Sequence, residues 1–279
     1  MFDPFITALN SQKAAQGWIG TLSQNLSNMY TPGYREVTST FSDYVNGVRL
    51  SETPRSTEQG KAIPGTAPTN MFIEGNGMFA VRKPDGGLFF TRLGDFRFNA
   101  EGNLVNSKGY ALQGYMLGDD GNPVSTGGAT NPGGTANNPS HSQGGPGHTP
   151  TVGINLWVDP ANGKFLGKYD EFKTRSDGTL VGIAEQGRVV TPLYKVALVN
   201  FVNPGGLAET EDQMFQTTAL SGEPVAGTGE IREGLLEKSN VDIRGSVALL
   251  QQAKLQMDFT SKLISTNKNL LEEALRLIQ

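Results

Sequence analysis

The sequence predicts an α+β protein in which N- and C-terminal helices pack as a coiled-coil-like terminal domain and a mainly antiparallel β domain lies between them. Apolar residues recur at spacings of three and four only near the two ends of the chain, which is the pattern of amphipathic helices. The interval between them contains short aromatic and β-branched runs separated by turn residues, which is typical of strands. We therefore expect three segments: 1–34 as the N-terminal helix, 35–234 as the β domain, and 235–279 as the C-terminal helix.

The N-terminal helix has an irregular apolar face and is expected to be weak on its own. Gly17 and Gly20 lie inside it, and each costs about 1 kcal/mol relative to Ala in a helix interior. The segment 30–33, which contains Pro32 and Gly33, then ends the helix. The apolar positions are Phe5, Leu9, Ile19, Leu22, Leu26 and Met29, and Gln12 and Gln16 form a polar notch among them.

The C-terminal helix is expected from about Ile243 to Ile278, a length of roughly 50 Å. Its apolar seam alternates spacings of three and four, the period of a coiled coil. Because the N-terminal helix is shorter and less regular, we expect neighbouring copies of the chain to cover the remaining apolar surface. The seam consists of Leu250, Ala253, Met257, Thr260, Ile264, Asn267, Leu271, Ala274 and Ile278.

The middle of the chain is predicted to form strands on both sides of a long loop. The loop, at about 118–153, is rich in Gly, Pro, Asn and Ser and too poor in apolar residues to form a core, so we expect it to be mobile. The expected strands are 71–73, 78–82, 88–92, 96–98, 103–105, 154–158, 179–184, 188–191 and 193–202, with turns at 84–87, 100–102 and 159–163.

Composition excludes several classes of function. The 279 residues carry a net charge of −4, so no general basic field is available to bind a nucleic acid. The absence of Cys excludes disulfides, zinc ribbons and thiol nucleophiles. The longest nearly apolar run, 194–202, is too short to cross a bilayer, which predicts a soluble chain. The first residues do not form a cleavable secretory signal, so any export would use another route.

Candidate catalytic and metal sites are weak. His141 and His148 are the only imidazoles, and both lie in the expected loop. The segment 118–122 has the composition of a calcium loop but lacks the later bidentate Glu, so we expect a plain turn. The segment 74–77 is Gly-rich, but a strand rather than a helix follows it, so we expect a tight bend instead of a phosphate site. Glu209 and Glu211 form a carboxylate pair in a polar stretch, where solvation is the default. We expect no active site, cofactor or metal.

Three segments resemble one known family. The stretch from Asn25 to Arg35, Asn-Leu-Ser-Asn-Met-Tyr-Thr-Pro-Gly-Tyr-Arg, resembles the Asn-Leu-Ala-Asn…Thr-Pro-Gly stretch of the bacterial flagellar rod and hook proteins. The stretch 234–243, Gly-Leu-Leu-Glu-Lys-Ser-Asn-Val-Asp-Ile, is similar to that family's segment before its C-terminal helix. Segments 73–79, 91–96 and 102–105 resemble its central β signature. The matched motif residues are Pro32, Gly33, Gly234, Glu237, Ser239, Asn240 and Val241.

The resemblance implies a structural, non-enzymatic protein that self-assembles into a helical tube, the drive shaft that transmits torque and encloses the export channel. It further implies a basal-body rod location, export through the flagellar type III apparatus without a cleaved signal, and contacts with other rod and hook proteins and with the surrounding bushing rings. Membrane insertion and nucleic acids are not expected. In such a tube the terminal helices of each subunit pack together and against neighbours, and the N-terminal helix orders on assembly. The expected interface is Leu9, Leu22, Asn25, Leu26, Asn28, Leu250, Met257, Ile264, Asn267, Leu271 and Ile278.

Two other functions stay open at this point. A hook subunit is the nearer alternative, although the chain is short for a hook protein with a large extra outer domain. The interval 35–71 is also short for a distal rod protein, which leaves the proximal rod open. A coiled-coil surface fibre or adhesin is the second alternative, and it would not need the N-terminal helix. An enzyme would require convergent carboxylates or a metal in the β domain.

Overall fold

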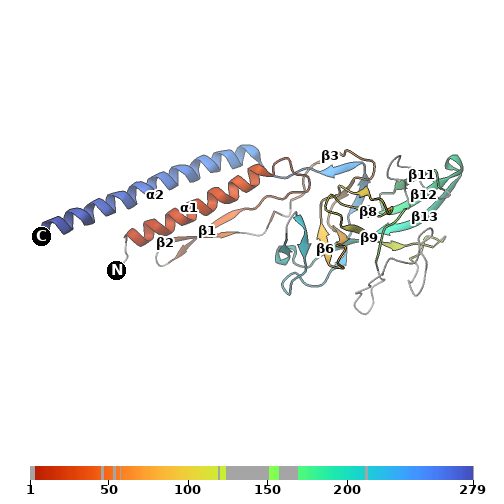
Figure 1. Cartoon of the computed structure of the whole chain (residues 1–279), viewed down its shortest axis with the longest axis horizontal. Coiled ribbons are helices and arrows are strands. Elements are labelled where there is room, and N and C mark those ends of the chain that lie inside the picture. Colours follow the sequence, from red (N-terminus) through yellow and green to blue (C-terminus); the bar gives the residue numbers. More distant parts are fainter. Residues whose placement is uncertain are drawn as a thin grey trace. The chain divides into compact units, whose positions relative to one another are not determined.

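The computed structural model describes residues 4–44, 47–52, 55–56, 58–118, 120–123, 151–156, 169–210 and 213–278. The chain forms two compact units. Met1–Glu58 and Ser239–Gln279 together make the first, which we call the helical unit, and Gln59–Lys238 makes the second, the β unit. The fold is α+β, with mainly antiparallel sheets and a helix near each end of the chain (Figure 1).

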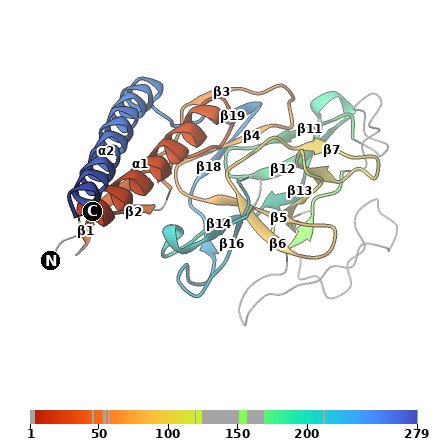
Figure 2. The same cartoon turned by 60° about the vertical axis from the view of Figure 1, so that its left-hand side comes forward.

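The helical unit contains two long helices that lie side by side (Figure 2). Helix α1 spans Pro4–Ser27 and helix α2 spans Ile243–Ile278. Their contact is built on Trp18, Leu22 and Ala253, with Ile19 and Leu250 at its margin. A polar contact lies further along the pair, where Gln12 Nε2 donates to Ser261 Oγ at 3.3 Å.

The ends of both helices follow from local chemistry. Helix α1 ends at Ser27, and the turn after it finishes at Gly33, whose φ of +71° is a conformation that favours glycine. Helix α2 has the predicted bounds. Asp242 precedes it as a cap, because its Oδ1 accepts the Arg244 N–H at 3.1 Å.

A small hairpin joins the helical unit rather than the β unit. Strands β1 (Ser39–Tyr44) and β2 (Gly47–Glu52) pair antiparallel, and β2 lies against α1. The ring of Phe41 in β1 meets Trp18 of α1 edge to face, with the centroids 5.0 Å apart. The first boundary of the β unit therefore falls at 58/59 and the second at 238/239, whereas the sequence suggested 34/35 and 234/235.

The β unit is built on one large antiparallel sheet with the strand order β11-β12-β13-β9-β5-β6-β16-β15. Two further pairs, β18 with β4 and β19 with β3, are also antiparallel. The strands are β3 (Ala62–Pro64), β4 (Met71–Glu74), β5 (Met78–Arg82), β6 (Leu88–Thr91), β7 (Arg97–Phe98), β8 (Leu104–Val105), β9 (Ala111–Met116), β10 (Val152–Gly153), β11 (Glu171–Thr174), β12 (Thr179–Ala184), β13 (Val189–Val196), β14 (Leu198–Asn200), β15 (Ala208–Glu209), β16 (Phe215–Gln216), β17 (Val225–Ala226), β18 (Glu230–Glu233) and β19 (Leu235–Glu237).

Strands 78–82 and 179–184 have the predicted bounds, but the prediction of separate strands at 188–191 and 193–202 was wrong. Strand β13 runs unbroken through Pro192. Leu180 of β12 pairs with Tyr194 and Val181 pairs with Pro192, so Leu193 is an extra residue in β13 itself, next to the proline. Such a bulge accommodates the missing N–H donor. Residues 154–156 continue past β10 without being a strand, and 157–158 lie outside the described residues.

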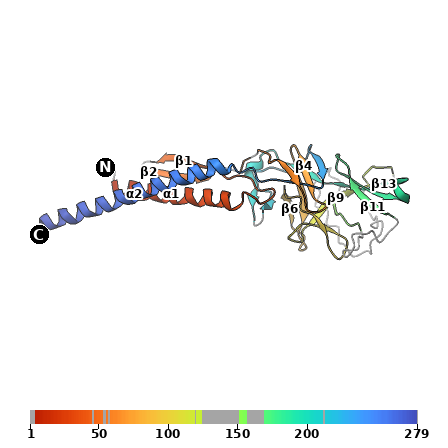
Figure 3. The same cartoon turned by 90° about the horizontal axis from the view of Figure 1, so that it is seen from above.

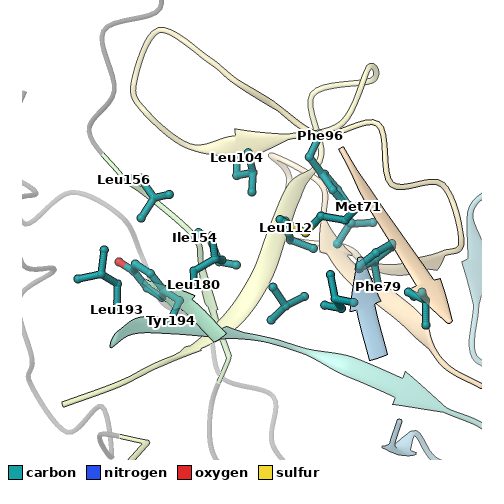
Figure 4. Packing of buried hydrophobic residues seen from close by; sticks show 14 of the residues in the cluster. Met71, Phe79, Phe96, Leu104, Leu112, Ile154, Leu156, Leu180, Leu193 and Tyr194 are labelled. Carbon is teal, nitrogen blue, oxygen red and sulfur yellow. The ribbon is translucent and has the colours of Figure 1, made fainter. Parts of the chain in front are cut away.

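The core of the β unit consists of buried apolar residues from strands of the large sheet, such as β5, β9, β12 and β13, and from β4 and β18 (Figure 4). Phe79 and Phe96 meet edge to face at 5.2 Å, and neither is exposed. Tyr194 is also buried, and this burial raises the pKa of its phenol to about 12. The fully buried large residues of this cluster are Met71, Ile73, Phe79, Phe96, Leu104, Leu112, Ile154, Leu180, Tyr194, Met214 and Ile231.

Candidate assembly surface

The predicted seam of α2 is the side that faces α1. Ala253 and Thr260 are buried there, and Leu250, Met257, Ile264 and Asn267 are half-buried. Near the C-terminal end of α2, α1 no longer packs against the seam, and Leu271 is 61% exposed. The reason is geometric, because α2 has 36 residues and α1 has 24, so α2 extends past the start of α1 (Figure 3). The Ile278 side chain lies outside the described residues.

The predicted positions on α1 fall into two groups. Leu22 is buried against α2, and Leu26 and Asn28 are half-buried. Leu9 is 36% exposed and lies beside the exposed Phe5 and Ile6. The apolar surface of the first turns of α1 is therefore only partly covered within the chain.

A second apolar stripe runs along α2, and the sequence reading missed it. We call Leu249, Leu255, Phe259, Leu263, Leu270 and Leu277 the outer stripe, and their exposed fractions range from 40% to 84%. Leu249, Leu263, Leu270 and Leu277 are separated by multiples of seven residues, so they recur on one side of the helix. This heptad repeat is present in the sequence, but the seam repeat is more regular and was the one we identified. A helix with apolar residues on two sides normally needs cover on both.

In the part of the chain that the structure describes, no helix is both long enough and apolar enough to span a membrane. The outer stripe belongs to a helix whose other positions carry Lys254, Asp258, Lys262, Lys268 and Glu272.

Asn25 lies inside the chain, although the sequence placed it at the assembly interface. It is fully buried, its Nδ2 donates to Val37 O at 2.8 Å, and its Oδ1 accepts the Val37 N–H at 3.0 Å. The buried Tyr34 hydroxyl donates to the same Oδ1 at 3.0 Å. Asn25 thus ties the last turn of α1 to the segment that follows it.

Asn240 holds the same segment from the other end of the sequence. Its Oδ1 accepts the Glu36 N–H at 2.7 Å, and its Nδ2 donates to Glu58 O at 2.9 Å. Its neighbour Ser239 is buried. We call Asn25, Tyr34, Val37 and Asn240 the asparagine clamp, because two asparagines from the two family-like motifs bind one backbone segment between them.

Carboxylates surround the clamp. Burial raises the pKa of Glu36, and the negative charges of Asp242 and Glu58 raise it further. The ring of Tyr34 lies under the Arg55 guanidinium at 4.7 Å, and Arg55 Nη1 donates to Arg35 O at 2.7 Å. The clamp therefore lies beside three carboxylates and the Arg55 guanidinium.

The motif residues in the β unit have structural roles. Gly234 has a φ of +73° and its N–H donates to Asn70 O at 2.7 Å. Glu237 is 2% exposed and pairs with Arg92, which is 7% exposed, at 3.7 Å between Nη1 and Oε2. Gly94 is required by a close approach, since a Cβ there would lie 1.7 Å from Met71 O. None of these three follows from periodicity or spacing alone.

The described segments that the sequence offered as weak candidates for phosphate, calcium or catalytic sites are turns or exposed residues. Gly75 and Gly77 have φ values of +93° and +145°, which confirms the predicted bend between β4 and β5. Asp120 Oδ1 accepts the Asn122 N–H at 3.1 Å in a turn. Glu209 is exposed. Among the residues that the structure describes, no three His, Asp or Glu side chains group closely enough to hold a metal ion. His141, His148, Asp119, Glu211 and most of the predicted 118–153 loop lie outside those residues.

Comparison with known proteins gives matches at two scales. Residues 72–143 match the family model described as the flagellar hook protein FlgE/F/G D1 domain. The chain is 24% identical to the flagellar basal-body rod protein FlgG of Borreliella burgdorferi, over 95% of this chain and 94% of that protein. It is 25% identical to the protein of the same name from Caulobacter vibrioides, over 95% of each chain. The flagellar hook protein FlgE of Borreliella burgdorferi is 34% identical, but over only 42% of this chain and 27% of the hook protein.

Proposed function

We propose that this chain belongs to the bacterial flagellar axial family, the rod and hook proteins, and is a structural subunit of the flagellar rod. The observation that carries the proposal is the outer stripe, whose apolar side chains on α2 stay exposed although α2 packs against α1. Neighbouring copies would cover this stripe, so each α2 would contact its own α1 with one side and another subunit with the other. Head-to-tail contacts that do not close into a ring generate an open helical assembly, which is the geometry of a tube.

The extent of the similarity favours a rod subunit over a hook subunit. The rod relatives match from end to end, whereas the hook relative matches fewer than half of this chain's residues and about a quarter of its own. A hook protein of that length has a large part with no counterpart here. The hook remains the second candidate, because the β unit carries the domain model that rod and hook proteins share.

In the assembled tube we expect the terminal helices to form coiled-coil-like packing. Leu250, Met257 and Ile264 would hold the intrachain seam, while Leu9 and Leu271, which are exposed in the single chain, would contact neighbours. Thr260 and Asn267 lie within the seam, and polar residues at such positions fix the register of paired helices. Asn25 would contribute indirectly, by shaping the end of α1.

The proposed role is structural and not catalytic. Its partners would be further copies of the chain, other rod and hook proteins, and the bushing rings that surround a rod. Its place would be the flagellar basal body, reached through the flagellar type III apparatus without a cleaved signal. The tube would transmit torque and enclose the export channel.

The test is to replace the chromosomal gene with outer-stripe variants. Leu263→Asp and Leu270→Asp place a charge in the proposed interface, and Ser265→Asp places the same charge on an exposed part of α2 that belongs to neither the seam nor the outer stripe. We expect the two stripe variants to be exported but to leave cells without complete rods, while Ser265→Asp builds normal ones. Normal rods in both stripe variants would contradict the proposed interface.

A further inference from the structure

The only covalent connections between the two units are the links at 58/59 and 238/239. If the chain is a rod subunit, as proposed above, torque carried by the chain itself enters the β unit through these two links. The residues next to them are therefore the first part of the β unit to bear the load. They lie side by side, because β3 and β19 pair antiparallel with Ala62 opposite Glu237 and Pro64 opposite Leu235.

This arrangement is mechanically weak on its own. Both links emerge from the same end of the β3–β19 pair, so a force that separates them opens the pair one hydrogen bond at a time. The pair is three residues long, and Pro64 contributes no backbone donor. The outermost backbone bond is the one from the Lys238 N–H to Lys61 O, at 2.8 Å. Something beyond the backbone ladder must hold this end closed if it is to resist a load.

Glu237 supplies a first fastening. Its Oε1 accepts the Gly60 N–H at 3.0 Å, beyond the last bond of the ladder, and its Oε2 pairs with Arg92 at 3.7 Å. Gly60 fits only because it lacks a side chain, since a Cβ there would lie 1.7 Å from Lys238 O. The two chain segments therefore touch at the point where they would separate.

Arg92 connects this fastening to the body of the sheet. Its Nη1 donates to Ile73 O at 3.3 Å and its Nη2 to Gly75 O at 2.7 Å, both at the end of β4. Gln59, the first residue of the β unit, binds the same two residues: its Nε2 donates to Ile73 O and its Oε1 accepts the Gly75 N–H at 3.0 Å. Both chain segments are thus anchored to the end of β4 and to the turn that follows it.

We propose that Gln59, Gly60, Arg92 and Glu237 form a clasp that keeps the two ends of the β unit together under load. A buried ion pair contributes little to stability compared with apolar residues of the same size, so its presence here calls for a role other than stability. Opening the mouth of the β3–β19 pair requires Glu237 to release Gly60 or Arg92. The clasp therefore resists a force that separates β3 from β19.

The test is constant-force pulling on the full chain. Because the sequence has no Cys, Glu58→Cys and Asp242→Cys give unique handles on the two links. We expect Glu237→Gln, which removes the charge but keeps the shape, to shorten the time to first opening about tenfold, or about 1.4 kcal/mol of barrier. Glu74→Gln makes the same change in the exposed pair with Arg232 and is expected to leave that time unchanged. The bond from Asn240 to Glu58 lies in the pulled path of every variant and cancels in the comparison.

A second pulling direction separates the clasp from a general loss of stability. Handles at Asp85→Cys and Arg188→Cys are exposed and do not load the β3–β19 mouth. The proposal requires Glu237→Gln to act only with the first pair of handles, and equal acceleration with both pairs would overturn it. If Glu237→Gln fails to fold, Gln59→Ala, at an exposed position, must shorten the opening time in the same selective way. These results do not depend on rod assembly, so the clasp and the rod assignment can fail separately.

Discussion

Removing the Asn25 side chain should destabilise the helical unit strongly, although Asn25 is a single polar residue. Asn25→Ala deletes three hydrogen bonds, two with the backbone of Val37 and one with the hydroxyl of Tyr34. Water cannot easily replace them, because Asn25 is fully buried and Tyr34 is 2% exposed. A buried polar group that loses its partner costs roughly 1 to 3 kcal/mol. With the lower value for each bond, we expect a loss of about 3 kcal/mol in the free energy of unfolding.

The helical unit can be followed separately by fluorescence. The chain has two tryptophans, and Trp157→Phe leaves Trp18 as the only one. Trp18 is buried in the helix contact and meets Phe41 edge to face, so its emission reports the unfolding of this unit. In a urea titration, Asn25→Ala should lower the midpoint without changing the slope, because the surface exposed on unfolding stays the same.

Asn28→Ala is the matched control. Asn28 is half-buried, and its Nδ2 donates to Gln24 O at 2.9 Å in a solvent-exposed bond, while its Oδ1 accepts from Thr31 Oγ1 at 3.1 Å. Because water can reach these groups, we expect the removal of Asn28 to cost less than about 1 kcal/mol. If Asn25→Ala and Asn28→Ala unfold at the same urea concentration, the clamp does not hold the helical unit together and the reasoning is refuted.

Leu271, Glu36 and Gly94 each give a further prediction. Leu271→Asp should abolish polymerisation of the purified protein, measured by sedimentation. Because Leu271 is exposed in the single chain, the β unit should stay folded, as measured by circular dichroism. Normal polymers would show that Leu271 is not in the interface. Glu36→Gln should raise the free energy of unfolding at neutral pH. Because the pKa of Glu36 is raised in the folded state, the folded state binds more protons than the unfolded state just above the ordinary pKa of glutamate, and the stability of the parent protein falls as pH rises through that window. Urea titrations at several pH values should show that the variant lacks this fall. Equal pH slopes would contradict the assignment. Gly94→Ala should destabilise the β unit by several kcal/mol in thermal unfolding, since the added Cβ would meet Met71 O, and Gly109→Ala, which has open space around it, should cost less.

The sequence was informative where one local pattern determines the structure. The bounds of α2 and the bend at Gly75 and Gly77 follow from heptad spacing and from the conformational freedom of glycine. Strand β13 was not predicted to continue through Pro192, because a proline indicates a break locally. The bulge at Leu193 that accommodates the proline becomes evident only from the pairing of β13 with β12.

The candidate site shows the same division. The seam was predictable because its residues repeat along one helix. The outer stripe was present in the sequence as a weaker repeat and became evident only when the side of α2 that α1 leaves uncovered was known. The contact between Asn240 and Glu36 and the Arg92–Glu237 pair join residues more than 100 positions apart, and no spacing rule predicts such contacts.

Electron cryotomography of motors in a strain that lacks the gene tests whether the chain is a subunit of the flagellar rod. If it is, the rods stop inside the cell envelope. A rod that reaches the outer surface without a hook would identify a hook subunit instead. Motors of normal appearance, in a strain without a second copy of the gene, would contradict the flagellar assignment.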